Sequence, residues 1–305
     1  MKWDFSRVDT SGPVSHLKDA LHLHLNDCIR EFATNYQSEL TVAIVINPND
    51  AMSSFHHLCT AVQQTPYKLY LLIDEYDNFA NEVLMSQGPQ GTPRYHELVT
   101  GEGVLKTIFK AVKAASAGRG LDKVFITGVS PLVMSDITSG YNVAKNIYLE
   151  PELNDLCGFT AAEVKTTVVQ LVKDCQLSAE TTSQIVLMMQ TFYNGYRFSR
   201  EEATSLVYNP TLALYFWEYF QTRCRSPGKM LDSNLALDKN KLVYLASLPQ
   251  GTPIIRDALL GTSPLMINEL SDRFSLTDLL KPNPDRSFMV SLLYYFGVLT
   301  LVGQT

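Results

Sequence analysis

The segment at residues 68–77, KLYLLIDEYD, constrains the fold of this chain more than any other. Its apolar run ends abruptly at Asp74, Glu75 and Asp77. A short apolar run between polar residues predicts a strand buried on both faces, as in a parallel sheet. Open α/β sheets bind their ligands at the carboxyl ends of such strands. The segment therefore predicts either a ligand site at the strand end or a strand followed by a solvated acidic turn.

An Asp-Glu pair after a buried strand is the Walker B pattern of P-loop NTPases. In that pattern the Asp holds the magnesium ion bound to the nucleotide phosphates, and the Glu orients the attacking water. The companion pattern G-x-x-x-x-G-K-[ST], which wraps the phosphates, is absent from the 305 residues. The nearest fragments, residues 117–120 (AGRG) and 227–230 (PGKM), lack its spacing. The sequence thus predicts the metal side of a nucleotide site without the phosphate side.

The composition is that of a globular protein with one large core or two smaller ones, because 46% of the residues are hydrophobic and 18% are charged. A net charge of −6 argues against a dominant nucleic-acid surface, which would be basic. The chain has neither an apolar segment after Met1 nor a stretch of 18 apolar residues. We therefore expect no signal peptide, no membrane span and a cytoplasmic (intracellular) location.

The cysteines and histidines show no metal-ligand spacing. The five cysteines, Cys28, Cys59, Cys157, Cys175 and Cys224, include no C-x-x-C pair, so we expect reduced, buried thiols. The histidine pairs are His22 with His24 and His56 with His57, and neither has a third ligand in view. Zinc is not expected.

Strands and helices alternate in the first half of the chain. We expect strands ending near residue 6, at 41–46, at 74 and at 128, with helices at 11–35, 49–64 and 103–116. Such alternation predicts βαβ units and a parallel sheet. After residue 154, a capping box at Thr160 and Glu163 starts a helix, and more helices are expected near 181–193, 210–223, 238–247 and 285–296. The predicted class is α/β: a parallel sheet flanked by helices over residues 1–153, then a helical domain over 154–305.

Further motifs follow in order. They are FITGVSPL at 125–132, GYNVA at 140–144, LCGFTAAEV at 156–164, FYNGYRF at 192–198 and VYNP at 207–210. Together with LIDEYD they resemble the AAA-ATPase-like family, a group of P-loop NTPases that often precede a PD-(D/E)XK nuclease-like domain. The resemblance runs from about Asp4 to the tail at 292–300.

The resemblance implies a P-loop NTPase-type sheet and the cofactors ATP and Mg²⁺. Members of the family usually carry an Arg-rich P-loop upstream of the position matching residue 1, and the nuclease-like domain follows the position matching the tail. We therefore expect a degenerate or truncated ATPase module that on its own binds ATP weakly or not at all. The alternative is a non-catalytic interaction or regulatory module that retains the NTPase scaffold.

The resemblance also suggests roles for single residues. Asp74 would hold Mg²⁺ and Glu75 would act on the attacking water. Thr127 would contact the γ-phosphate or that water, unless it is simply a satisfied hydroxyl at a strand end. Ser130 would share this sensor role or form a turn. Arg197 would reach a phosphate, or form an ion pair between the domains.

Two other patterns are better explained by local structure than by catalysis. Asp77 is expected to be the N-cap of the next helix, although it could also support the Asp-Glu pair. Asp155, Glu163 and Lys165 scan as the D…ExK of a metal-dependent nuclease. That chemistry needs a strand, whereas Glu163 and Lys165 fall in the first turn of a helix and face apart. We reject the nuclease reading.

The absent P-loop strand and helix would leave the strands ending at Asp74 and Thr127 without part of their apolar cover. Exposed apolar strands are costly. We expect compensation by self-association, by a partner chain or domain that supplies a P-loop, or by the β-branched segment 41–46.

Overall fold

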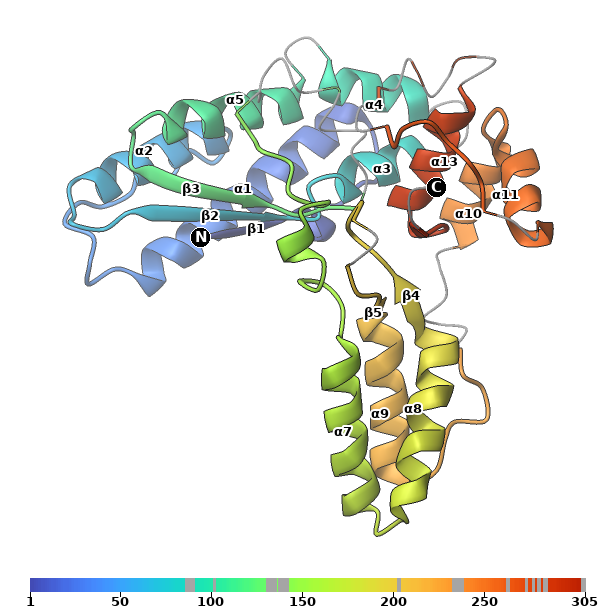
Figure 1. The fold of residues 1–305 in the computed structure, drawn as a ribbon. Coiled ribbons are helices and arrows are strands. Elements are labelled where there is room, and N and C mark those ends of the chain that lie inside the picture. Colours follow the sequence, from blue (N-terminus) through green and yellow to red (C-terminus); the bar gives the residue numbers. More distant parts are fainter. Residues whose placement is uncertain are drawn as a thin grey trace. The chain divides into compact units, whose positions relative to one another are not determined.

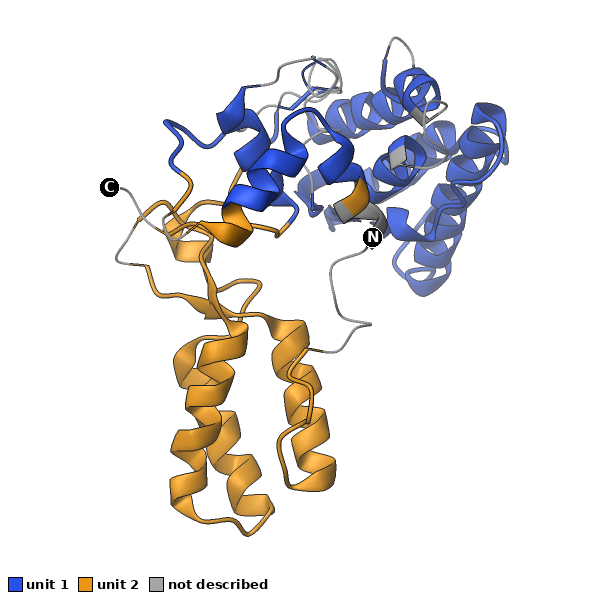
Figure 2. Cartoon of the chain, turned by 90° about the vertical axis from the view of Figure 1, so that its right-hand side faces the viewer, with its two compact units in different colours: residues 1–144, 244–257, 266–296 blue, residues 145–243, 258–265, 297–305 orange. Residues whose placement is uncertain are grey.

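The computed structural model describes residues 1–85, 91–100, 103–129, 136, 143–201, 204–231, 239–261, 264–271, 274–275, 278, 281 and 285–302. The chain divides into two compact units (Figure 2). The first unit contains residues 1–144, 244–257 and 266–296, and the second contains 145–243, 258–265 and 297–305. This division differs from a single boundary near residue 153, because two later segments belong with the first unit.

A parallel sheet of three strands forms the centre of the described part of the first unit (Figure 1). The strands are β1 (Lys2–Asp4), β2 (Leu69–Asp74) and β3 (Leu121–Ile126). Their order is β1-β2-β3, so β2 pairs with a neighbour on each side. The predicted α/β class with a parallel sheet is confirmed.

The described part of the first unit also contains several helices. They are α1 (Val14–Asn35), α2 (Ala51–Gln63), α3 (Asn78–Met85), α4 (Gly91–Val99), α5 (Val104–Ser116) and α13 (Arg286–Tyr295), with a 3₁₀ turn, η1, at Phe5–Arg7. Two more, α10 (Lys239–Ser247) and α11 (Gly251–Leu260), cross the division between the units. Within the described ranges, no helix has the length and apolar character needed to cross a membrane.

The sheet is covered on one face. Helices α1, α2 and α5 pack there (Figure 1), and the Trp3 and Phe55 rings meet edge to face with centroids 5.1 Å apart. On the other face Tyr70, Leu72 and Phe125 are 53%, 47% and 42% exposed. The expectation of a strand buried on both faces is therefore wrong for β2, whose side chains alternate between buried and exposed.

Residues 41–46 do not form the expected strand. They run between α1 and α2, and Val42 and Val45 are exposed. β-Branched residues favour strands chiefly through packing against neighbouring strands. Among the residues that the structure describes, no strand pairs with this segment, so it does not join the described sheet.

The second unit is built on three packed helices, α7 (Ala161–Asp174), α8 (Ala179–Tyr193) and α9 (Pro210–Arg223). The capping box predicted at the start of α7 is present: the Thr160 side chain accepts from the Glu163 amide, and Glu163 accepts from the Thr160 amide. Two short antiparallel strands, β4 (Asn194–Tyr196) and β5 (Val207–Tyr208), precede α9, and a 3₁₀ turn, η3, spans Pro151–Leu153. This unit thus has its own apolar core.

The expectation of reduced, buried cysteines is confirmed in full only for Cys59, because Cys28 is a free thiol that is only half-buried. Cys175 and Cys224 form a disulfide, with Cα atoms 5.5 Å apart. They are the C-caps of α7 and α9. The disulfide therefore joins the carboxyl ends of these two helices. Cys157 is a free thiol but is exposed, whereas Cys59 is free and buried.

Because Phe216 lies in the core of the second unit, we expect Phe216→Ala to lower the free energy of unfolding strongly. Phe216 is fully buried and contacts the rings of Tyr193 and Phe220. Removing a buried aromatic ring costs about 3–5 kcal/mol of unfolding free energy. Phe192→Ala is the matched control, because that ring is half exposed and should cost about 0.5 kcal/mol or less. Urea unfolding checks both variants, and equal losses would contradict the assignment of Phe216 to the core.

Candidate functional site

The side chains of Asp74 and Thr127 meet at the carboxyl edge of the sheet. Asp74 is the last residue of β2, and Thr127 follows β3 directly. The Thr127 amide donates to the Ile73 carbonyl at 2.8 Å, which extends the β2–β3 pairing past the end of β3. The Thr127 hydroxyl donates to Asp74 Oδ1 at 2.6 Å. The parallel pairing thus brings together two residues that lie 53 positions apart.

The structure adds Lys2 and Asp4 to this edge. Asp4 is the register partner of Asp74 across β1 and β2. Lys2 Nζ lies 2.8 Å from Asp74 Oδ2 and 3.6 Å from Asp4 Oδ2. Sequence reasoning missed both residues, although Asp4, like Asp74, is an acidic residue at the end of an expected strand. An ammonium group therefore bridges two carboxylates at the strand ends.

These contacts keep the acidic groups ionised. The hydrogen bond from Lys2, followed by that from Thr127, lowers the pKa of Asp74 below its usual value. The Ser6 hydroxyl and amide lower the pKa of Asp4 in the same way. The hydrogen bond to Asp74 is the largest cause of a raised pKa for Lys2. At neutral pH the edge therefore carries two carboxylates and one ammonium.

The backbone turns sharply after Asp74. Glu75 has a φ of +53°, in the left-handed region that non-glycine residues seldom adopt. Asp77 then precedes α3, and its carbonyl accepts from the Asn81 amide at 2.8 Å, as expected for an N-cap residue. Its buried carboxylate accepts from the Asn81 side chain at 2.8 Å and from the Val129 amide at 3.1 Å. Asp77 therefore supports the strand ends and also occupies the predicted cap position.

For two other predicted site residues, the structure describes no position relative to this edge. Ser130 lies outside the described residues. Arg197 belongs to the second unit, where its amide donates to Thr300 Oγ1 at 3.2 Å and its Nη1 donates to the Val302 carbonyl at 2.8 Å. The structure therefore groups Asp74 with Thr127, and Glu75 follows Asp74 in the chain.

The donor set at the edge limits the metals that it can hold. Among the residues that the structure describes, no three His, Cys, Asp or Glu side chains are grouped as metal ligands. Mg²⁺ is commonly held by one or two carboxylates, together with waters and substrate phosphates. The ionised Asp74 fits that kind of partial site.

A parallel α/β sheet with an acidic strand end is the class of structure that these observations define. Residues 1–138 match the model of the AAA-ATPase-like family, described as a predicted AAA-ATPase. No curated protein and no solved structure matches the chain. The resemblance to the AAA-ATPase-like family is thus confirmed over the segment that contains the whole sheet. Such a family implies the use of a nucleotide and Mg²⁺.

The contact between Lys2 and Asp74 predicts a change in the titration of Asp74. In Lys2→Gln the pKa of Asp74 should rise toward its ordinary value of 3.8. Because the folded-state pKa is lowered, this interaction stabilises the fold above pH 3.8 and loses its effect as the pH falls through the folded-state pKa. The variant should therefore be less stable than the wild type at neutral pH and equally stable in strong acid.

Carboxyl-detected NMR titration checks this expectation. Lys281→Gln is the matched control, because Lys281 pairs with Asp278 at 2.6 Å and lowers the pKa of that residue instead. The control should leave the pKa of Asp74 unchanged. An unchanged pKa of Asp74 in Lys2→Gln would show that the ion pair does not form.

Proposed function

We propose that this chain is a degenerate or truncated ATPase module, in which the carboxyl edge of the sheet is the metal- and water-handling side of a nucleotide site. The observation that carries the proposal is the hydrogen bond from Thr127 to Asp74, between the ends of neighbouring parallel strands. Ligands of open α/β sheets bind at such strand ends. The family match over residues 1–138 supports the same assignment.

Each candidate residue receives a role in this proposal. Asp74 would hold Mg²⁺, and Glu75 would orient the attacking water. Thr127 would contact the terminal phosphate or that water, and the same role is proposed for Ser130. Arg197 would neutralise phosphate charge, as arginines do in phosphoryl transfer. Asp74 is ionised, as a magnesium ligand must be.

Lys2 competes with a metal ion at this site. Its ammonium group lies close to Oδ2 of both Asp74 and Asp4, so a cation already bridges the two carboxylates. A divalent ion must displace Lys2 to take both groups. The proposal therefore gives the chain weak intrinsic affinity for Mg²⁺.

In this proposal, the element that binds the nucleotide phosphates comes from outside residues 1–305. Backbone amides of a glycine-rich loop normally surround the phosphates, and a Lys reaches the terminal ones. No G-x-x-x-x-G-K-[ST] segment occurs among the 305 residues. We propose that a partner chain or another domain supplies this element, and that the attached effector in such proteins is a nuclease-like domain.

A second candidate function is a non-catalytic interaction module. The observation that favours it is the open face of the sheet, where Tyr70, Leu72 and Phe125 are exposed. Asp74 shares this face with Tyr70 and Leu72, because alternate strand residues point the same way. Contiguous exposed apolar side chains commonly mark interaction surfaces. In this alternative the face binds a second copy of the chain or a partner, and the acidic edge has no catalytic role.

The proposed metal site predicts an effect of Mn²⁺, a paramagnetic substitute for Mg²⁺. Mn²⁺ should broaden the amide NMR signals of residues around Asp74 and Thr127, more strongly in Lys2→Gln and not in Asp74→Asn. Asp122→Asn is the control, because Asp122 is an exposed residue of β3. Broadening that does not depend on Asp74 would overturn the metal role.

The missing phosphate loop predicts that residues 1–305 bind Mg²⁺-ATP weakly or not at all. Asp74 and Glu75 cannot replace the backbone amides that hold the phosphates. Isothermal titration measures this directly. Micromolar ATP affinity would overturn the idea that the phosphate side comes from elsewhere, without affecting the Mn²⁺ result.

The alternative function predicts self-association through the open sheet face. Sedimentation experiments should show a mass that rises with concentration, and Leu72→Glu should reduce that rise. Leu187→Glu is the matched control, since Leu187 is an exposed leucine of α8. A monomer at every concentration would contradict self-association and leave a partner chain as the only occupant that this alternative allows.

A further inference from the structure

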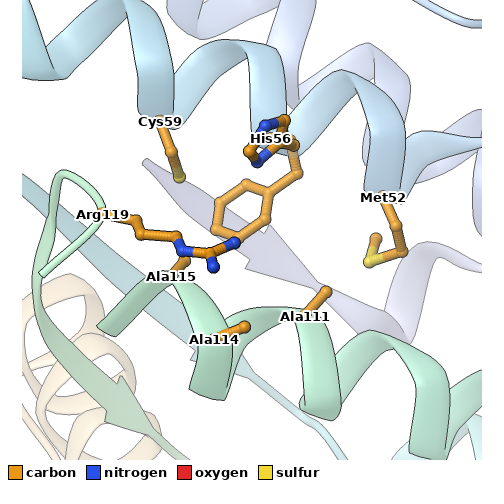
Figure 3. Close-up of a pocket in the computed structure, with 8 residues that line it drawn as sticks. Met52, His56, Cys59, Ala111, Ala114, Ala115 and Arg119 are labelled. Atoms are coloured by element: carbon orange, nitrogen blue, oxygen red, sulfur yellow. The ribbon is translucent and has the colours of Figure 1, made fainter. Parts of the chain in front are cut away.

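A second concave site lies between α2 and α5, on the helical layer of the first unit (Figure 3). Its volume is about 180 Å³. It is lined by Met52, Phe55, His56, Cys59, Ala111, Ala114, Ala115 and Arg119. None of these side chains takes part in the strand-end site.

The floor of this pocket is apolar. Phe55, Cys59 and Ala115 are buried there. Burial raises the pKa of the Cys59 thiol to about 12, so this group is neutral at physiological pH. Small alanines along α5 leave the space open. The floor therefore suits an apolar group rather than a charged one.

The rim of the pocket carries a permanent cation, the guanidinium group of Arg119. Arg119 extends its guanidinium group over the pocket, and the His56 ring lies on the α2 side (Figure 3). Both residues are exposed. Within the described ranges, no hydrogen bond or ion pair engages the guanidinium of Arg119. A planar guanidinium is suited to bidentate binding of a carboxylate.

The loop that carries Arg119 is held in place. Gly118 and Gly120 both have a φ of +91°, which favours glycine. Gln63 of α2 donates to the Gly118 carbonyl at 3.0 Å. A Cβ at position 120 would lie 2.5 Å from the Cys59 carbonyl, so the loop approaches α2 too closely for any other residue. The AGRG sequence therefore forms a turn that holds the backbone of Arg119 beside the pocket.

We propose that this pocket binds a small organic monocarboxylate, with its carboxylate on Arg119 and its apolar body against Phe55 and Ala115. A cavity of about 150 Å³ holds benzene in another protein, so a ring bearing one carboxylate matches the available space. An inorganic anion would leave the apolar floor uncovered. A neutral apolar molecule would gain nothing from the charge of the guanidinium.

Benzoate is the probe that tests the proposal on the full chain. It should shift the NMR signals of α2 and α5 at millimolar concentration. Arg119→Gln should weaken its binding about tenfold, because a charge-assisted bidentate pair is lost. Arg225→Gln is the matched control, since Arg225 is an exposed arginine of the second unit and should leave binding unchanged.

Three comparison molecules separate the parts of the proposal. Benzyl alcohol lacks the charge, acetate lacks the ring, and phosphate is an inorganic anion, so each should bind more weakly than benzoate. A second variant, Ala111→Phe, should fill the pocket and abolish the benzoate shifts while circular dichroism confirms folding. Equal binding of benzyl alcohol or phosphate would overturn the proposal, as would the absence of any benzoate shift.

Discussion

β2 forms backbone hydrogen bonds with a neighbouring strand on each side, and this pairing determines which polar side chains of the first unit lie together. Because β2 pairs in parallel with β1 and with β3, the carboxyl ends of all three strands meet along one edge. Asp4, Asp74 and Thr127 come from distant parts of the sequence, and only this pairing makes them neighbours. The acidic edge follows from strand order, and the Asp-Glu pattern alone would not specify its other members.

The sequence predicted best those features that depend on local patterns. The apolar runs before Asp74 and Thr127 are strands, and parallel pairing accounts for the contact between these two residues. The capping box of Thr160 and Glu163 is present because both of its hydrogen bonds lie within one helical turn. The residues that set each strand, and the two that form the capping box, are close together in the chain.

The features that were missed depend on contacts between distant segments. Lys2 reaches Asp74 only through the register of β1 on β2. Cys175 and Cys224 meet because two helix ends are adjacent. Residues 41–46 have the composition of a strand, but no strand of the described part of the chain pairs with them. Periodicity likewise could not show that the described helices cover one face of the sheet and leave the other exposed. A continuous apolar run can form either a strand buried on both faces or a strand with one exposed face.

The buried carboxylate of Asp77 has a mechanical consequence. It holds Asn81 in the first turn of α3 and, through the Val129 amide, the chain that leaves β3. A Cβ at Gly128 would lie 2.4 Å from this carboxylate, so the two segments are in close contact. These contacts connect the turn after β2 to the segment after Thr127. A displacement of the turn at Glu75 would have to break the hydrogen bond between Asp77 and Val129 or carry that segment with it.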